Sequence, residues 1–155
     1  MTIYALSTGS GISGLAVIRV SGKNTSEVVK RITNSELPAP RVATLKKFNK
    51  IGQKSLIDEG VIIWFPGPNS YTGEDMAEFH THGSRAVIKS MHSAIAKIKG
   101  CRLAEPGEFT KIAFLNGKIN LLKAESIGDL ISSETEIQRK QAIKIMEGKS
   151  SNKFN

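Results

Sequence analysis

The amino-acid sequence predicts an α+β domain, a mixed sheet with flanking helices, followed by one long helix. Several short apolar segments are rich in β-branched residues, as is typical of strands. Helix-like segments separate some of them, and connections of hairpin length join others, which favours a mixed sheet. From residue 120 onward, apolar residues recur at helical spacing without a strand signal.

Six segments are predicted to be strands. The strongest candidate is 57–65, which ends at Pro66-Gly67-Pro68 because proline cannot continue a hydrogen-bonded ladder. The segment 14–20 is apolar except for one charge, Arg19. In chain order, the expected strands are Ile3–Ser7, Gly14–Val20, Ala43–Phe48 (at a sheet edge), Ile57–Phe65, Met76–His82 and Cys101–Ala104.

Four helices are predicted from their caps and apolar stripes. Asn24 or Thr25 begins the first, Ser84 caps the second, and Pro106 lies at the start of the third. The fourth, 120–147, is too long to pack wholly on a small domain, so it is expected to leave the domain or to pack on a partner. The expected ends are near Ile32, Gly100, Gly117 and Gly148.

Length and composition indicate one soluble domain with a short piece of a second. We expect a domain over 1–118 and the first helix of a truncated helical domain over 119–155. No apolar run approaches the roughly 20 residues of a membrane span, and the first residues lack the basic and apolar pattern of a signal peptide, so none is expected. The single cysteine, Cys101, excludes an internal disulfide and suits a reducing compartment, so a cytoplasmic protein is expected.

The formal charge of +8 allows an anionic partner such as nucleic acid without requiring one. Basic residues are in surplus in residues 1–57 and 138–155, whereas the middle of the chain is slightly acidic. One alternative hypothesis is therefore a basic fragment that binds tRNA through these two stretches. Few aromatic residues and no RNA-binding signature weigh against it.

Two glycine-rich patterns resemble nucleotide sites but lack the required context. Residues 9–14 match G-x-G-x-x-G, yet a strand follows where the pattern needs a helix N-terminus. Gly148-Lys149-Ser150 resembles the end of a P-loop, yet Ile143 stands where the first glycine belongs. This chain alone is therefore expected not to hydrolyse GTP, and no catalytic residue is assigned.

Two further candidates favour a structural interpretation. His80 and His82 lie two apart on one predicted strand and could form half of a metal site, but no third ligand is evident. Cys101 has no histidine nearby in sequence to activate it, so burial is the better interpretation.

Three segments together carry a family resemblance. They are 14–22 (G-L-A-V-I-R-V-S-G), 65–78 (F-P-G-P-N-S-Y-T-G-E-D-M-A-E) and 106–118 (P-G-E-F-T-K-I-A-F-L-N-G-K). They resemble the N-terminal domain of the tRNA-modification GTPases called MnmE or TrmE. The resemblance extends from Ile3 to about Gly148, and runs this long and this rich in glycine, proline and asparagine are unlikely by chance.

The resemblance implies a fold and a function. The fold would be related to tetrahydrofolate-binding aminomethyltransferase domains, and the domain would form a homodimer. It would bind 5-formyltetrahydrofolate or 5,10-methylenetetrahydrofolate. With a flavoprotein partner, MnmG or GidA, the whole GTPase modifies carbon 5 of the tRNA wobble uridine, so contact with tRNA would come through the complex. The chain is expected to end before the GTPase domain and the C-terminal cysteine motif.

Residue by residue, the family's folate contacts fall on Arg19, Glu78 and Lys118. A carboxylate such as Glu78 can accept both hydrogens of a pterin 2-amino group and its neighbouring ring N–H. Arg19 interrupts an apolar strand, and a buried guanidinium needs a partner. Two structural alternatives remain: a surface pair of Glu78 with Lys118, and a pair of Arg19 with Asp75.

The chain departs from the family at positions where arginine is usual. Ile12 stands within 8–14, Glu105 precedes the 106–118 run, and Ile112 follows Lys111. Fewer positive charges near a polyanionic ligand could weaken binding. A second alternative is therefore a degenerate dimerisation and interaction remnant that no longer binds folate.

Overall fold

The computed structural model describes residues 1–7, 14–119, 128–137 and 139. The α+β prediction is confirmed, with a mixed six-stranded sheet in the order β3-β4-β5-β2-β1-β6. Neighbouring strands are antiparallel except for β1 and β6, which are parallel. The elements are β1 (Thr2–Leu6), β2 (Leu15–Ser21), α1 (Thr25–Thr33), β3 (Thr44–Asn49), β4 (Leu56–Phe65), β5 (Met76–His82), α2 (Arg85–Ala96), β6 (Cys101–Leu103) and α3 (Glu108–Leu115). A further helical segment covers 128–137.

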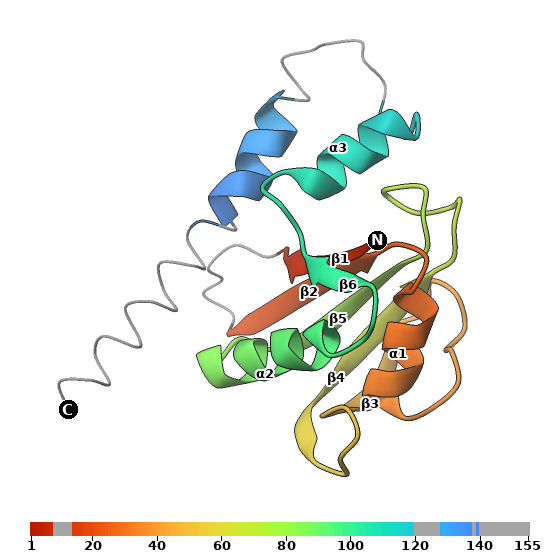
Figure 1. The fold of residues 1–155 in the computed structure, drawn as a ribbon, viewed down its shortest axis with the longest axis vertical. Helices are drawn as coiled ribbons and strands as arrows, with labels where there is room; N and C mark the ends of the chain where they lie inside the picture. Colours follow the sequence, from red (N-terminus) through yellow and green to blue (C-terminus); the bar gives the residue numbers. More distant parts are fainter. Residues whose placement is uncertain (8–13, 120–127, 138, 140–155) are drawn as a thin grey trace, which may run out of the picture.

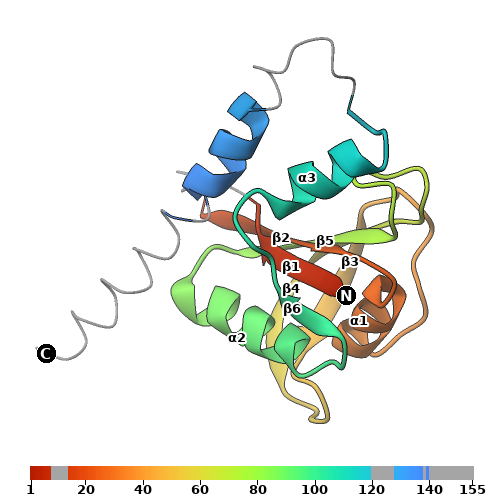
Figure 2. The ribbon, with the colours of Figure 1, turned by 45° about the horizontal axis from the view of Figure 1, so that its top comes forward.

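One face of the sheet carries the main core. Helices α1 and α2 cover this face, as Figures 1 and 2 show. Alternate residues of the central strands point into this layer, as the two-residue period of a strand requires. The fully buried members of this cluster include Ile18, Val20, Val28, Val29, Ile32, Phe48, Ile62, Ala77, Phe79, Met91 and Ile95.

The opposite face is covered only in part. Figure 2 shows α3 and the 128–137 helix above the sheet, on the side away from α1 and α2. A smaller cluster of Ile3, Ala5, Met76 and Phe109 holds α3 against β1 and β5. The remaining outer face leaves room for polar side chains of β2 and β5.

The predicted strands agree closely with the observed ones, whereas α2 ends at Ala96, four residues before the expected end at Gly100. All six predicted strands match the observed ones to within one residue at each end. Ser84 caps α2 as predicted by accepting from the N–H of Val87. Asn24 is the N-cap residue of α1, but its side chain donates to the carbonyl of Lys99 instead of capping the helix.

Some predictions fall wholly or partly outside the described residues. These are the turn at 9–14, the P-loop-like end at 148–150 and both ends of the 120–147 helix. Within the described part of that helix, 128–137 packs against the domain itself. None of the helices that the structure describes is long and apolar enough to cross a membrane.

A largely buried histidine, His92, is expected to make stability depend on pH. The His92 ring on α2 meets the Tyr4 ring edge-on, with centroids 5.4 Å apart, and its Nε2 is buried without a hydrogen-bond partner among the described residues. Burial lowers the pKa of His92 from 6.5 to about 4. The unfolded chain therefore takes up a proton at a pH where the folded chain does not.

Stability should be fully present above about pH 6.5 and should decline toward pH 4, by on the order of 3 kcal/mol from His92 alone. A His92→Phe variant, which keeps a ring against Tyr4, should lose this part of the acid sensitivity. Thermal unfolding followed by circular dichroism between pH 7 and pH 4.5 checks this. Parallel pH profiles for both proteins would contradict it.

Candidate ligand-binding site

Arg19 lies on the face of β2 that points away from the main core. Its neighbours Ile18 and Val20 are fully buried on the other face, so strand alternation turns the guanidinium toward α3. The antiparallel register places Arg19 directly opposite Glu78 of β5. The Arg19 Nη2 to Glu78 Oε2 distance is 3.9 Å, which is a long ion pair with both side chains about a quarter exposed.

Two aromatic rings flank the Arg19 guanidinium. Its Cζ atom lies 5.0 Å from the centroid of the Tyr71 ring and 5.6 Å from that of Phe109. Both distances are within the range of cation–π contacts. The Arg19 Nε is buried, and among the described residues it has no hydrogen-bond partner. The guanidinium is thus fixed in direction but keeps an unused donor.

Tyr71 is held by an ordered loop between β4 and β5. The Tyr71 hydroxyl lies 2.9 Å from the Thr110 hydroxyl of α3. Thr72 hydrogen-bonds through its hydroxyl to Ser21 at 2.8 Å, and its carbonyl accepts from Asn116 Nδ2 at 2.7 Å. The loop is therefore joined to β2 on one side and to α3 on the other.

A pocket of about 240 Å³ opens beside Arg19. Aliphatic and aromatic side chains form most of its wall, and polar groups converge on it from β2, α3, the 128–137 helix and the segments that follow β1 and β4. The lining residues are Leu6, Ser7, Arg19, Tyr71, Phe109, Thr110, Leu130, Glu134 and Ile137. An apolar wall with a few fixed polar groups is typical of small-molecule sites.

Glu134 brings a carboxyl group into this pocket from the 128–137 helix. Burial raises the pKa of Glu134, whereas a hydrogen bond from the backbone N–H of Thr110 and the charge of Arg19 act in the opposite direction. The Oε2 atom of Glu134 is buried and has no partner among the described residues. The pocket therefore contains an unused acceptor as well as the unused donor of Arg19.

Glu78 lies outside the pocket wall, between Arg19 and His80. The His80 Nε2 is 3.1 Å from Glu78 Oε1. One carboxylate oxygen thus contacts the imidazole while the other faces the guanidinium. This leaves Glu78 at the rim, where it can accept hydrogen bonds from a ligand that extends out of the pocket.

Lys118 follows α3 and lies across the 66–75 loop from the pocket. Its backbone N–H donates to the carbonyl of Ala113 at 2.9 Å. A Cβ atom built on Gly73 would come within 3.4 Å of Lys118 Cγ, so the lysine stem packs on this loop. Lys118 is not part of the pocket lining. The structure thus brings Arg19 and Glu78 together and does not place Lys118 in the pocket wall.

Neither structural alternative for the three predicted residues is seen. No ion pair between Glu78 and Lys118 occurs among the described residues. Asp75 accepts the backbone N–H of Gly67 at 2.8 Å, and the ion pair of Arg19 is with Glu78.

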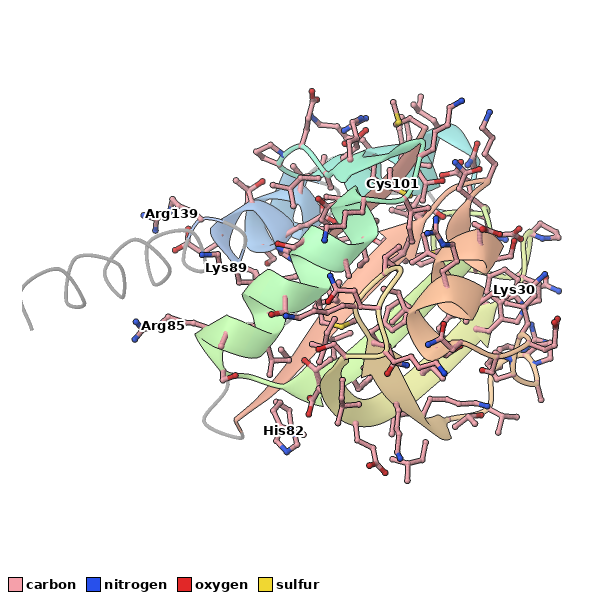
Figure 3. The ribbon with its side chains drawn as sticks, turned by 60° about the horizontal axis from the view of Figure 1, so that its bottom comes forward. Lys30, His82, Arg85, Lys89, Cys101 and Arg139 are labelled. Carbon is pink, nitrogen blue, oxygen red and sulfur yellow. The ribbon has the colours of Figure 1, made fainter. Side chains whose placement is uncertain are left out.

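The other chemical candidates have local roles. His82 and Asp58 are joined at 2.8 Å on the rim of the sheet, where Figure 3 shows His82 at the end of β5. Within the described ranges, no three metal-ligating side chains come together. Cys101 is a free thiol that is only partly buried, and burial raises its pKa.

Sequence reasoning missed three residues that shape the site: Tyr71, Phe109 and Glu134. Tyr71 and Phe109 lie inside the glycine- and proline-rich runs, so a search for ring pairs near the lone charge of β2 could have found them. No local signal could have identified Glu134, because its carboxyl reaches the pocket only through the packing of a distant helix.

Fold and pocket together define an α+β domain whose candidate site lies between the sheet and a second helical layer. The chain belongs to the family described as the GTP-binding protein TrmE N-terminus, whose model matches residues 2–118. The resemblance predicted from the three motif segments is therefore confirmed.

Curated relatives agree with this assignment. The chain is 74% identical over 155 residues to the tRNA modification GTPase MnmE of Pelagibacter ubique, covering all of this chain and 35% of that protein. It is 51% identical over 147 residues to the mitochondrial 5-taurinomethyluridine-[tRNA] synthase subunit GTPB3 of Danio rerio, covering 95% of this chain and 29% of that protein. It is 48% identical over 147 residues to the tRNA modification GTPase MnmE of Parvibaculum lavamentivorans, covering 95% of this chain and 34% of that protein. The chain spans about a third of the length of these relatives.

Proposed function

We propose that this chain is the folate-binding and dimerisation module of a GTPase that modifies carbon 5 of the tRNA wobble uridine. The observation that carries the proposal is Arg19, held between Tyr71 and Phe109 beside Glu78, with its Nε unused. A flat, polar heteroaromatic ligand fits such a site, because it can stack near the rings and satisfy the guanidinium.

The ligand is 5-formyltetrahydrofolate or 5,10-methylenetetrahydrofolate. Glu78 accepts paired N–H groups of the pterin, since one carboxylate can take two parallel hydrogen bonds. Lys118 meets a carboxylate or carbonyl oxygen toward the other end of the molecule. A pocket of about 240 Å³ is smaller than the roughly 300–1,000 Å³ of drug-sized ligand sites. It therefore encloses one part of the folate, and the remainder lies over the rim.

The open part of the outer sheet face supports a homodimer. Register partners Leu45, Val61, His80 and Val17 form a row across four strands, and Leu45 is 66% exposed. Exposed apolar residues gathered on one face are typical of interaction surfaces. We further propose the flavoprotein MnmG as partner, tRNA contact through that complex, and the cytoplasm as location.

Titration calorimetry with 5-formyltetrahydrofolate tests the function. Wild-type protein should bind, and Glu78→Gln should bind about tenfold more weakly, because an amide offers one acceptor where the carboxylate offers two and because bonds to a charged group are the stronger ones.

Glu59→Gln is the matched control, because Glu59 is an exposed carboxylate on the neighbouring strand β4. It should bind like wild type. No heat with wild type at high protein concentration would overturn the proposal and favour a dimerisation remnant.

A further inference from the structure

The helix over residues 128–137 forms one wall of the candidate pocket. Leu130, Glu134 and Ile137, spaced at three and four residues, line the pocket from one face of this helix. In Figures 1 and 2 it lies beside α3, on the same side of the sheet. It lies beyond residues 2–118, the part that the family model matches.

The contact between this helix and α3 is close. Gly107, the N-cap residue of α3, has a φ of 72°, and a Cβ atom there would come within 2.6 Å of Ile131 Cγ2. Only glycine suits both the left-handed backbone and the lack of space. The glycine of the P-G-E-F run thus serves the approach of the 128–137 helix.

Glu134 stabilises this contact with only part of its hydrogen-bonding capacity. Gly107 has no side chain with which to cap α3, and the backbone N–H of Thr110 donates to the Glu134 carboxyl instead. An N-terminal N–H bonded to a carboxylate is favourable, because the helix dipole is positive there. The second oxygen, Oε2, is buried and makes no hydrogen bond within the described ranges.

Two buried polar atoms with no hydrogen-bond partner in the described part of the chain therefore line one pocket. Arg19 Nε is a donor, and an ionised Glu134 Oε2 is an acceptor. Buried polar groups nearly always have hydrogen-bond partners in native proteins, because leaving such a group without a hydrogen bond costs free energy. A ligand group that presents a carbonyl oxygen next to an N–H would satisfy both.

We propose that Glu134 is a ligand-recognition residue: its free oxygen accepts an N–H of the bound folate, whose neighbouring carbonyl oxygen accepts the Arg19 Nε–H. The recognised group is the amide of the aminobenzoyl-glutamate part of folate, because Glu78 already accepts the lactam N–H of the pterin. This inference rests on the proposed function, and it extends the site to a helix outside the matched domain.

The charges around Glu134 are compatible with this role. Arg19 of β2 and Lys111 of α3 favour its ionised form, whereas burial and Glu108 of α3 oppose it. A ligand N–H that donates a hydrogen bond to Oε2 would further favour the ionised form of Glu134. Bound ligand would then join β2 to the 128–137 helix and hold that helix in place.

Glu134→Gln is the decisive variant. The amide has one oxygen, so it can serve either the Thr110 N–H or the ligand, whereas the carboxylate serves both. We expect 5-formyltetrahydrofolate to bind at least tenfold more weakly in calorimetry, with the melting temperature of the ligand-free protein almost unchanged.

Glu136→Gln is the matched control on the same helix. Glu136 is exposed and pairs with Arg139 at 2.7 Å. Figure 3 shows Arg139 pointing away from the sheet. Binding should stay within twofold of wild type. In hydrogen exchange, ligand should protect residues 128–137 in wild type and in Glu136→Gln, but much less in Glu134→Gln.

The possible results separate this inference from the proposed function. A lower melting temperature with unchanged affinity in Glu134→Gln would show that Glu134 only caps α3, and would overturn the inference while folate binding stands. No binding to wild type would overturn both. In titrations with fragments of the ligand, p-aminobenzoyl-glutamate should lose affinity in Glu134→Gln, whereas pterin-6-carboxylate should bind wild type and variant alike. Equal affinity of wild type and variant for both fragments would also count against the inference.

Discussion

Replacing Arg19 with alanine should abolish folate binding, with affinity falling at least a hundredfold. The substitution removes the donor that faces the pocket, the charge opposite Glu78 and the group between the Tyr71 and Phe109 rings. It also leaves Glu78 without its guanidinium partner, and losing a charged hydrogen bond together with a cation–π contact accounts for a factor of this size. Isothermal titration with 5-formyltetrahydrofolate measures it.

Arg19→Lys separates charge from geometry. Lysine keeps the positive charge but lacks the planar fork and the Nε–H, so affinity should remain at least about tenfold below wild type. Arg85→Ala is the matched control, because Arg85 is exposed at the start of α2 and points into solvent in Figure 3. Wild-type affinity in Arg19→Ala would show that the ligand binds elsewhere.

Gly60→Ala should be the most destabilising single-methyl change in the sheet. A Cβ atom at Gly60 would lie 2.0 Å from the backbone carbonyl oxygen of His80 and 2.9 Å from Phe48 Cε2. A backbone oxygen cannot move aside as a side chain can, so β4 and β5 would have to separate locally. Overpacking of this kind costs about 3 kcal/mol, which corresponds to a fall of roughly 10 °C in melting temperature.

The same strain would reach the site. Gly60 directly precedes Val61, which pairs with His80, and lies three positions before Ile63, which pairs with Glu78. Folate affinity should therefore fall along with stability. Gly128→Ala is the control, because a Cβ atom there meets nothing within 4 Å. Alanine in a helix is favourable, so its melting temperature should not fall. Equal melting temperatures of Gly60→Ala and wild type would show that the strands adjust freely.

The sequence predicted the positions of the strands and helices far better than it predicted which elements lie next to one another in the fold. The alternation of Ile18, Arg19 and Val20 predicts a strand with one charge on its outer face. The pairing of Arg19 with Glu78 depends on register between two strands 59 positions apart in the chain, which neither strand specifies by itself. The motif resemblance named both residues and Lys118, but it could not show that Lys118 lies off the pocket wall.

Other parts of the site depend on tertiary packing. The periodicity of 120–147 predicts a helix but not the surface that the helix meets. Apolar residues at helical spacing are equally consistent with a partner interface, and the short connection between Glu134 and Thr110 arises only once α3 has folded onto the sheet. Similarly, the N-cap of α1 was predicted at Asn24 or Thr25, but the Asn24 side chain turns to the carbonyl of Lys99.

The two outer strands of the sheet bear on how the protein meets other chains. β6 has only three residues, and β3 carries Lys46 and Lys47 and an irregularity between Phe48 and Asn49. Edge strands that are short, charged or bulged resist pairing with a further strand. Such an edge offers few backbone hydrogen-bonding groups, and a bulge increases the local twist. Association by continuous strand addition, the route to fibrils, is thus disfavoured, and copies of this domain would meet through side chains on the sheet face.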